Sequence, residues 1–240
     1  MQIKTKAIVL HTLKYTDNSV IVHAYTEQHG RMAYVVNGVK SKKSVLRAAL
    51  QQPLSILEIE TNYNPKNEIQ RIKESRLAYA FTSIPYNPSK NALSLFVAEL
   101  LYRAIKEPHT DKNLYNFLSE SIIILDTTES GVGNFHLVFM TQLSHFLGFK
   151  PHSETAAKDY YFDLQNGVFS PQQGFSEYLN VQDSKLFSSL LGLNFENMGQ
   201  AKFSKEEKYS LLSALLSYYK LHLSNFSQIK SLEVMLQLFS

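Results

Sequence analysis

The sequence contains no cysteine among its 240 residues. This absence excludes disulfide bonds, thiolate nucleophiles, and zinc or iron–sulfur centres bound through cysteine, and it is consistent with a reducing cytoplasm. No run of about 18 apolar residues occurs, so no membrane-spanning helix is expected. Residues 1–19 include basic side chains but no sustained apolar core and no small-residue cleavage site, so we expect no signal peptide and a cytoplasmic protein.

Motifs of the common enzyme classes are absent as well. There is no GxxxxGK[ST] phosphate loop, because "SGVGNF" (130–135) lacks both the spacing and the lysine, and no HExxH, GxSxG or kinase signature occurs. The eight histidines are widely scattered and form no local metal-binding cluster. Glu58 and Glu60 share one strand face, from which an acid pair of a glycosidase could be built, but a solvent-exposed face is the expected role. We therefore predict no catalytic residue, no metal ligand and no cofactor.

The charge that is present is unevenly distributed. Hydrophobic residues make up 44% and charged residues 19% of the chain, which is typical of globular proteins, and the net charge is +3. Residues 1–80 contain twelve Lys or Arg against six Asp or Glu, whereas residues 81–240 contain twelve against fifteen. A basic region within a nearly neutral chain indicates a polyanionic partner.

The first third of the chain has the pattern of β-strands. Five short segments rich in β-branched and aromatic residues are separated by turn signals, namely residues 5–13, 18–26, 30–38, 53–61 and 67–79. Five strands in roughly 75 residues favour a small closed barrel, in which closure removes exposed strand edges. We predict a five-stranded barrel of the oligonucleotide/oligosaccharide-binding (OB) type.

After Pro85 and Pro88 the hydrophobic period changes to that of helices. Helices are predicted over residues 89–107, 111–127, 133–149, 204–223 and 229–239. Their predicted end signals are Ser89 and Asp111 as N-caps, Ser204 with Glu207 as a capping box, and Gly148 as a C-terminal stop. An irregular hairpin is predicted over residues 159–174, turning at Asn166-Gly167. The predicted class is α+β, with an OB domain over residues 1–80 and a helical domain over 81–240 that carries a small insert near 153–175.

One run of residues concentrates positive charge between two predicted strands. The basic segment, "NGVKSKKSVLR" (37–47), contains Lys40, Lys42, Lys43 and Arg47 and no acid. Such side chains on a loop can meet backbone phosphates without fixing base identity, which gives sequence-tolerant, salt-sensitive binding. Charged loops are also common on soluble proteins without this role.

Tyrosines accompany the basic segment in the same predicted strands. Tyr25, Tyr34 and Tyr63 are candidate stacking platforms for unpaired bases, although packing within the sheet is the commoner role of a strand tyrosine. The coincidence of a basic segment, a basic domain and a barrel of the kind that binds single strands indicates nucleic-acid binding.

Four stretches carry a family resemblance: "TKAIVLHTLKYTDNSVIVHAYTEQHGRMAYVVNGVKSKKS" (5–44), "LQQPLSILEIE" (50–60), "VFMTQLSHFLGFKPH" (138–152) and "YYKLHLSNFSQIKSLEVM" (218–235). In this order they resemble the bacterial RecO family of DNA repair proteins. The resemblance implies an amino-terminal OB barrel, a helical carboxy-terminal domain and a non-catalytic role as a recombination mediator. Such proteins bind single- and double-stranded DNA, anneal complementary strands, work with RecR, and dock the acidic C-terminal tail of the single-strand-binding protein.

The resemblance also assigns residues. Lys40, Lys42, Lys43 and Arg47 fall in the basic loop of the family, and Arg31 begins the strand that leads into it. Together with Tyr34, the predicted DNA-binding set is Arg31, Tyr34, Lys40, Lys42, Lys43 and Arg47. A nucleoid-associated location in the cytoplasm follows from this role.

The sequence departs from the family pattern at one place. Many members carry a four-cysteine zinc site after the helix that ends in Leu-Gly, whereas residues 152–174 contain no cysteine. Zinc is therefore not expected. A small lobe without a metal needs apolar packing instead, for which Tyr160, Tyr161, Phe162 and Phe169 are candidates.

Two other functions remain open at this stage. A protein-interaction adaptor would dock only other proteins on its barrel and helices, and it would ignore naked DNA at physiological salt. A hydrolase without a known motif would cleave DNA in the presence of magnesium.

Overall fold

The computed structural model describes residues 2–37, 49–50, 52–106, 108–157 and 159–238. By their internal contacts the residues form two compact units: 1–127 together with 229–238, and 128–228 together with 239–240. No helix in the described part of the chain has the length and apolar character needed to cross a membrane.

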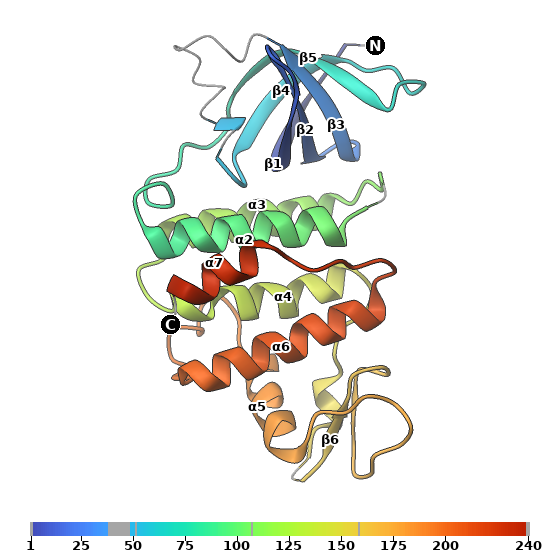
Figure 1. The fold of residues 1–240 in the computed structure, drawn as a ribbon, viewed down its shortest axis with the longest axis vertical. Coiled ribbons are helices and arrows are strands. Elements are labelled where there is room, and N and C mark those ends of the chain that lie inside the picture. Colours follow the sequence, from blue (N-terminus) through green and yellow to red (C-terminus); the bar gives the residue numbers. More distant parts are fainter. Residues whose placement is uncertain (1, 38–48, 51, 107, 158, 239–240) are drawn as a thin grey trace. The chain divides into compact units, whose positions relative to one another are not determined.

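Five strands close into a barrel in the first unit (Figure 1). They are β1 (Gln2–Thr16), β2 (Ser19–Thr26), β3 (Gly30–Asn37), β4 (Ile56–Asn62) and β5 (Ile69–Leu77). Their order around the barrel is β1-β2-β3-β5-β4, and only the β3–β5 pair is parallel. The predicted α+β class, the five strands and the OB-type barrel are confirmed.

The barrel interior is filled by alternate side chains of its strands, as the period of two requires. Small and branched residues dominate it together with one aromatic ring, and the buried cluster consists of Ala7, Val9, Val22, Ala24, Tyr34, Val36, Ala49, Leu50, Leu57 and Ile59. Ala49 and Leu50 belong to the connection between β3 and β4. That connection is therefore anchored in the core at its C-terminal end.

Strand β1 is much longer than its pairing with β4. Residues 2–8 pair with β4, whereas pairing with β2 runs from Ala7 to Thr16, with irregularities between Val9 and His11 and between Lys14 and Thr16. In the described part of the chain, the second half of β1 therefore pairs with β2 alone.

Helices α2 (Pro88–Ala104), α3 (Lys112–Thr127) and α7 (Ser231–Leu238) also belong to the first unit. Helix α2 packs against β1, α3 and α7. The predicted N-cap Ser89 is wrong. Asn87 caps α2 by accepting a hydrogen bond from the Lys90 amide, because Pro88, with its fixed φ and missing N–H, fits the first helical position. The predicted cap of α3 is confirmed, since Asp111 Oδ1 accepts from two amides of its first turn.

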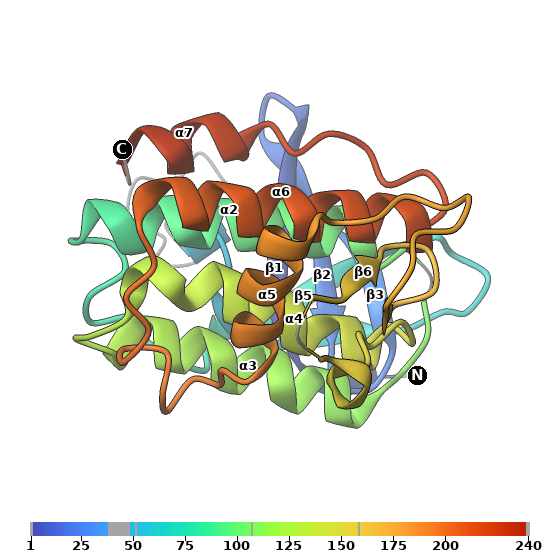
Figure 2. The ribbon, with the colours of Figure 1, turned by 90° about the horizontal axis from the view of Figure 1, so that it is seen from below.

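The second unit contains α4 (Phe135–Phe146), α5 (Val181–Leu191), α6 (Lys205–His222) and the hairpin of β6 (Tyr161–Asp163) and β7 (Val168–Ser170). Short 3-10 turns precede α4 (Val132–Asn134) and the hairpin (Ser153–Thr155). Helix α5 packs against both α4 and α6 (Figure 2). No sequence pattern had been assigned to α5, although Asn180 caps it by accepting from the Asp183 amide.

The other end signals of this unit are confirmed. Ser204 and Glu207 form the reciprocal capping box of α6, and Gly148, with φ +85°, follows the end of α4. The hairpin turns at Asn166-Gly167, where Gly167 has φ +67°. Both glycines occupy the left-handed region that favours a residue without Cβ.

Aromatic side chains hold the hairpin insert. Phe162 is fully buried and Phe169 nearly so, and the Phe162 ring centroid lies 4.9 Å from that of Phe169, 4.6 Å from that of Phe187 on α5 and 5.8 Å from that of Tyr218 on α6. The packing role predicted for Phe162 and Phe169 is confirmed. Tyr160 and Tyr161 are only half-buried.

Candidate nucleic-acid interface

The basic segment connects β3 to β4. Lys40, Lys42, Lys43 and Arg47 lie outside the described residues. The structure fixes the two flanks of the segment: β3 ends at Asn37, and Leu50 is 2% exposed in the barrel core.

Arg31 lies on β3 with its guanidinium directed at helix α2. Nη1 donates hydrogen bonds to the carbonyl oxygens of Tyr102, at 2.8 Å, and of Ile105. The guanidinium carbon lies 4.5 Å from the centroid of the Tyr102 ring, within the range of a cation–π contact. A cation at these last carbonyls of α2 is stabilised by the helix dipole, while burial lowers the pKa of Arg31.

The structure places Arg31 against α2, whereas a DNA contact is predicted from the sequence. Both hydrogen bonds to the carbonyls come from Nη1, and a phosphate at this nitrogen would have to replace the carbonyls of α2. A DNA contact through the rest of the guanidinium stays a prediction. Arg31 joins β3 to α2 in this structure.

Tyr34 also departs from its predicted role. Its side chain is 1% exposed in the barrel core, and this burial raises its pKa. Tyr34 follows the inward phase of β3, so the barrel interior covers both ring faces and leaves no surface on which a base can stack. This is a correction of the stacking assignment, because the side chain contributes to packing.

The other two tyrosines predicted as stacking platforms make internal contacts as well. Tyr25 is fully buried, and its hydroxyl lies 3.4 Å from the carbonyl oxygens of His109 and Asp111. The half-buried ring of Tyr63 stacks on that of His29, with a centroid distance of 4.5 Å.

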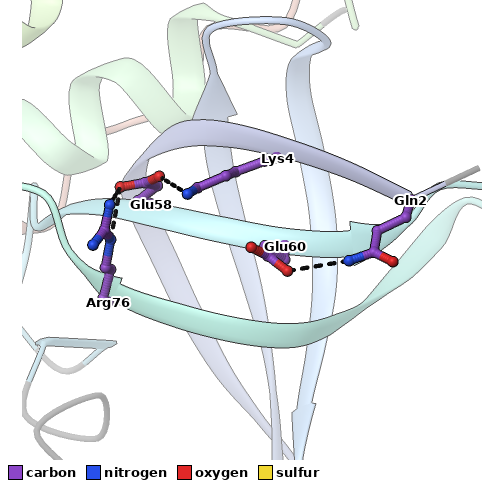
Figure 3. A network of polar contacts seen from close by, with 5 residues as sticks. All are labelled: Gln2, Lys4, Glu58, Glu60 and Arg76. Atoms are coloured by element: carbon purple, nitrogen blue, oxygen red, sulfur yellow. Dashed lines mark hydrogen bonds and ion pairs between the residues drawn. The ribbon is translucent and has the colours of Figure 1, made fainter.

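Acids and bases alternate on the outer face of β1, β4 and β5. Figure 3 shows that Glu58 is shared by two cations: Lys4 Nζ lies 2.6 Å from Oε1, and Arg76 places Nε and Nη2 at 2.8 and 2.5 Å from Oε2. Hydrogen bonds from Lys4 and then Arg76 lower the pKa of Glu58. Gln2 similarly donates to Glu60 at 3.2 Å. Lys4 and Arg76 on this face thus share one carboxylate, and Glu60 adds a second acid beside them.

Two histidines meet α2 at the barrel surface. The centroid of the Tyr102 ring lies 4.6 Å from that of His11 and 5.3 Å from that of His23. Burial lowers the pKa of both histidines, so the neutral ring is favoured. Within the described ranges no three His, Cys, Asp or Glu side chains are arranged to hold a metal ion.

Comparison with known proteins connects this architecture to DNA repair. Two family models match the chain: "Recombination protein O N terminal" over residues 1–81 and "Recombination protein O C terminal" over residues 85–233. A protein named "DNA repair protein RecO" from Azobacteroides pseudotrichonymphae is 40% identical over 240 residues, which is all of both chains. Proteins of the same name from Bacteroides fragilis and Flavobacterium psychrophilum are 41% identical over 98% and 36% identical over 100% of both chains, respectively.

Proposed function

The chain belongs to the RecO family of DNA repair proteins, and from this premise we propose that it is a recombination mediator that binds single- and double-stranded DNA without catalysing a reaction. The DNA-binding part is the OB barrel of residues 1–80. The basic segment between β3 and β4 supplies the contacts to phosphate.

The charge of the basic segment is the observation that supports this proposal most directly. Four cationic side chains occur there without an acid, and the flanks of the segment belong to an OB-type barrel. Elsewhere on the barrel, Lys4 and Arg76 share the carboxylate of Glu58, and Arg31 contacts α2. Phosphates are therefore expected at Lys40, Lys42, Lys43 and Arg47 before they are expected on the outer face of β1, β4 and β5.

The same charge provides a mechanism for strand annealing. Lysine and arginine side chains that neutralise backbone phosphates reduce the repulsion between two complementary strands. Base pairing then supplies the free energy of annealing, so no catalytic group is required. Because phosphates carry no base identity, this activity does not depend on sequence.

Two protein partners follow from family membership. We propose that the chain works with RecR and docks the acidic C-terminal tail of the single-strand-binding protein, which would place it where recombinase must replace that protein on single strands. A nucleoid-associated location follows from DNA binding.

The test is the salt dependence of binding to a fluorescein-labelled single-stranded oligonucleotide, followed by fluorescence anisotropy. Each lost phosphate contact reduces the slope of log K against log salt by about 0.7 for a single strand. Replacement of Lys40, Lys42 and Lys43 by alanine should therefore lower the slope by about 2 and weaken binding. The matched control replaces three exposed lysines of the second unit, Lys185, Lys202 and Lys220, and removes the same net charge.

The outcomes separate the proposal from its alternatives. An equal loss of slope in both triple variants would show that only the overall charge matters and would remove the basic segment from the site. Wild-type protein that ignores naked DNA at physiological salt would favour a protein-interaction adaptor. Strand annealing of complementary oligonucleotides, with and without single-strand-binding protein, tests the mediator role itself.

A further inference from the structure

Among the described residues, strand β1 has no backbone partner beyond Val9 on the side that faces β4, an edge called here the free edge. The Val9 amide donates to Ser55 and its carbonyl accepts from Leu54, both at 3.0 Å, on the side that faces β4. From Thr12 to Thr16 the described residues provide no backbone hydrogen bond on that side. An unpaired edge of this kind presents N–H and C=O groups to another strand.

The register identifies the backbone groups on this edge. Those of Val9 point away from β2, and in a regular strand every second residue would do the same. The bulge between Val9 and His11 inserts one residue and shifts this phase. The N–H and C=O groups of Thr12 and Lys14 therefore point away from β2.

A groove with a volume of about 1020 Å³ runs along the free edge. His11, Thr12 and Lys14 of β1 all line it, and Ala98 and Tyr102 of α2 line the opposite side. Because neighbouring residues of a strand point to opposite faces, a groove that touches both His11 and Thr12 follows the edge of the strand and does not lie on one face. The exposed Leu95 and the half-buried Pro53 also line it.

The rim of the groove favours an acidic ligand. Its two acids are already paired: Asp17 lies 3.2 Å from Lys14, and Glu99 lies 3.0 Å from Arg103 and accepts two further bonds from Ser231 at 2.8 Å. Lys230 is exposed on the same rim, and the described residues offer it no ion pair. Among the described residues of the rim, Lys230 is therefore the cation that remains for an acidic ligand.

From the free edge, the apolar border and the charge of the rim, we propose that an extended peptide of a partner protein binds in this groove as an added β-strand. Its backbone would pair with Thr12 and Lys14, and residues 12–16 offer a length of about 17 Å at the usual rise per residue. Alternate side chains of the peptide would be apolar, against Pro53 and Leu95, and acidic, toward Lys230. The inference does not depend on DNA binding by the basic segment.

A second copy of the chain fits this groove less well than a peptide. If two copies paired through their β1 edges, each edge would receive the β1–β2 hairpin of the other copy. Helix α2 and residues 230–231 also line the groove and would leave little room for a hairpin. A single extended chain satisfies the edge without displacing them.

The test uses the full chain and a fluorescein-labelled hexapeptide of alternating aspartate and valine. Comparison peptides replace aspartate by lysine, or carry N-methyl groups on alternate residues so that one edge of the peptide loses its N–H donors. We expect the aspartate peptide to bind at millimolar or lower concentration, to shift the amide resonances of Thr12 and Lys14, and to bind at least severalfold tighter than the lysine peptide. N-methylation of the edge that faces β1 should abolish binding.

Variants of the protein test the same geometry. Lys14→Pro removes the edge N–H, which proline tolerates on an unpaired strand side, whereas the matched Lys14→Ala variant removes only the side chain. Binding should be lost in Lys14→Pro, retained in Lys14→Ala and weakened severalfold in Lys230→Glu. Equal binding by the proline and alanine variants, or equal binding of the methylated and unmethylated peptides, would overturn the proposal, as would no binding by any peptide. The methylated peptides decide the question on wild-type protein if Lys14→Pro does not fold.

Discussion

Replacement of Asp126 by alanine is expected to destabilise the first unit strongly. The Asp126 carboxylate at the end of α3 is 1% exposed. One oxygen accepts from the Thr82 amide and hydroxyl and from the Tyr79 hydroxyl, and the other accepts from the amides of Ser83 and Ile84, all at 2.8–3.1 Å. This one side chain fixes the segment between β5 and α2.

The size of the effect follows from these contacts. The hydrogen bonds from Thr82, Ile84 and Ser83 outweigh the cost of burial and lower the pKa of Asp126 to about 2, from an ordinary value of 3.8. That shift corresponds to about 2 kcal/mol in favour of the charged form. Alanine would also leave three amides without an acceptor, so we expect a loss of about 3 kcal/mol, a large part of the 5–15 kcal/mol typical of a domain.

Asparagine should rescue little of this stability. Donors surround both carboxylate oxygens, so the amide group of Asp126→Asn would face at least two of them in either orientation. Urea denaturation followed by far-UV circular dichroism measures the free energies, with Asp17→Asn, which removes an exposed ion pair to Lys14, as a control worth about 0.5 kcal/mol.

The pH dependence provides a second measurement of the same interaction. A depressed pKa means that the contribution of Asp126 is complete above pH 3.8 and is lost as the pH falls toward about 2. Wild type and Asp126→Asn should therefore converge in this range. A loss below about 1 kcal/mol in Asp126→Ala, or a difference independent of pH, would refute the reasoning.

Two further predictions concern the contact of the barrel with α2 and the residues that follow it. Gly30→Ala should lower the melting temperature far more than Gly148→Ala. Both glycines have positive φ, but a Cβ at Gly30 would lie 2.2 Å from the His109 carbonyl oxygen, whereas a Cβ at Gly148 would meet open space. Similar losses of melting temperature in the two variants would contradict the contact at Gly30. Burial lowers the pKa of His11 and His23, so their contribution to stability is present above pH 6.5 and lost as the pH falls through the lowered values. The double variant with glutamine at both positions should show a flatter decrease of melting temperature from neutral to mildly acidic pH, and an unchanged decrease would refute the assignment.

The barrel could be predicted because its signals are local. Each strand is marked by β-branched residues within it and by turn residues at its ends, and five such segments leave few ways to close a sheet. The same holds for helix ends: the capping box of Ser204 and Glu207 lies within four residues of sequence. Two capping side chains occur at the start of α2, those of Asn87 and Ser89. Only the position of Pro88 between them indicates that Asn87 is the cap.

The site was less predictable because its decisive contacts are distant in sequence. The period of two puts Tyr34 and Val36 on the same face of β3, but the sequence does not show that this face is the barrel interior, where both residues lie. The partners of Arg31 are carbonyls of Tyr102 and Ile105, more than 70 residues away. A basic residue beside a basic segment has the same local pattern whether it binds phosphate or the end of a helix, so sequence alone could not separate the two.

The hairpin insert shows the same limit for a single carboxylate. Aromatic packing around Phe162 could be predicted, but Asp163 had the pattern of an ordinary turn residue. In the structure Asp163 is 3% exposed, and it accepts from the amides of Gln165 and Asn166 and from the side chains of Asn166 and Ser176. One buried carboxylate thus joins the turn of the hairpin to the chain 13 residues later. Hydrogen bonds to Asp163 and the packing of Phe162 hold this cysteine-free hairpin, and neither depends on metal supply or redox state.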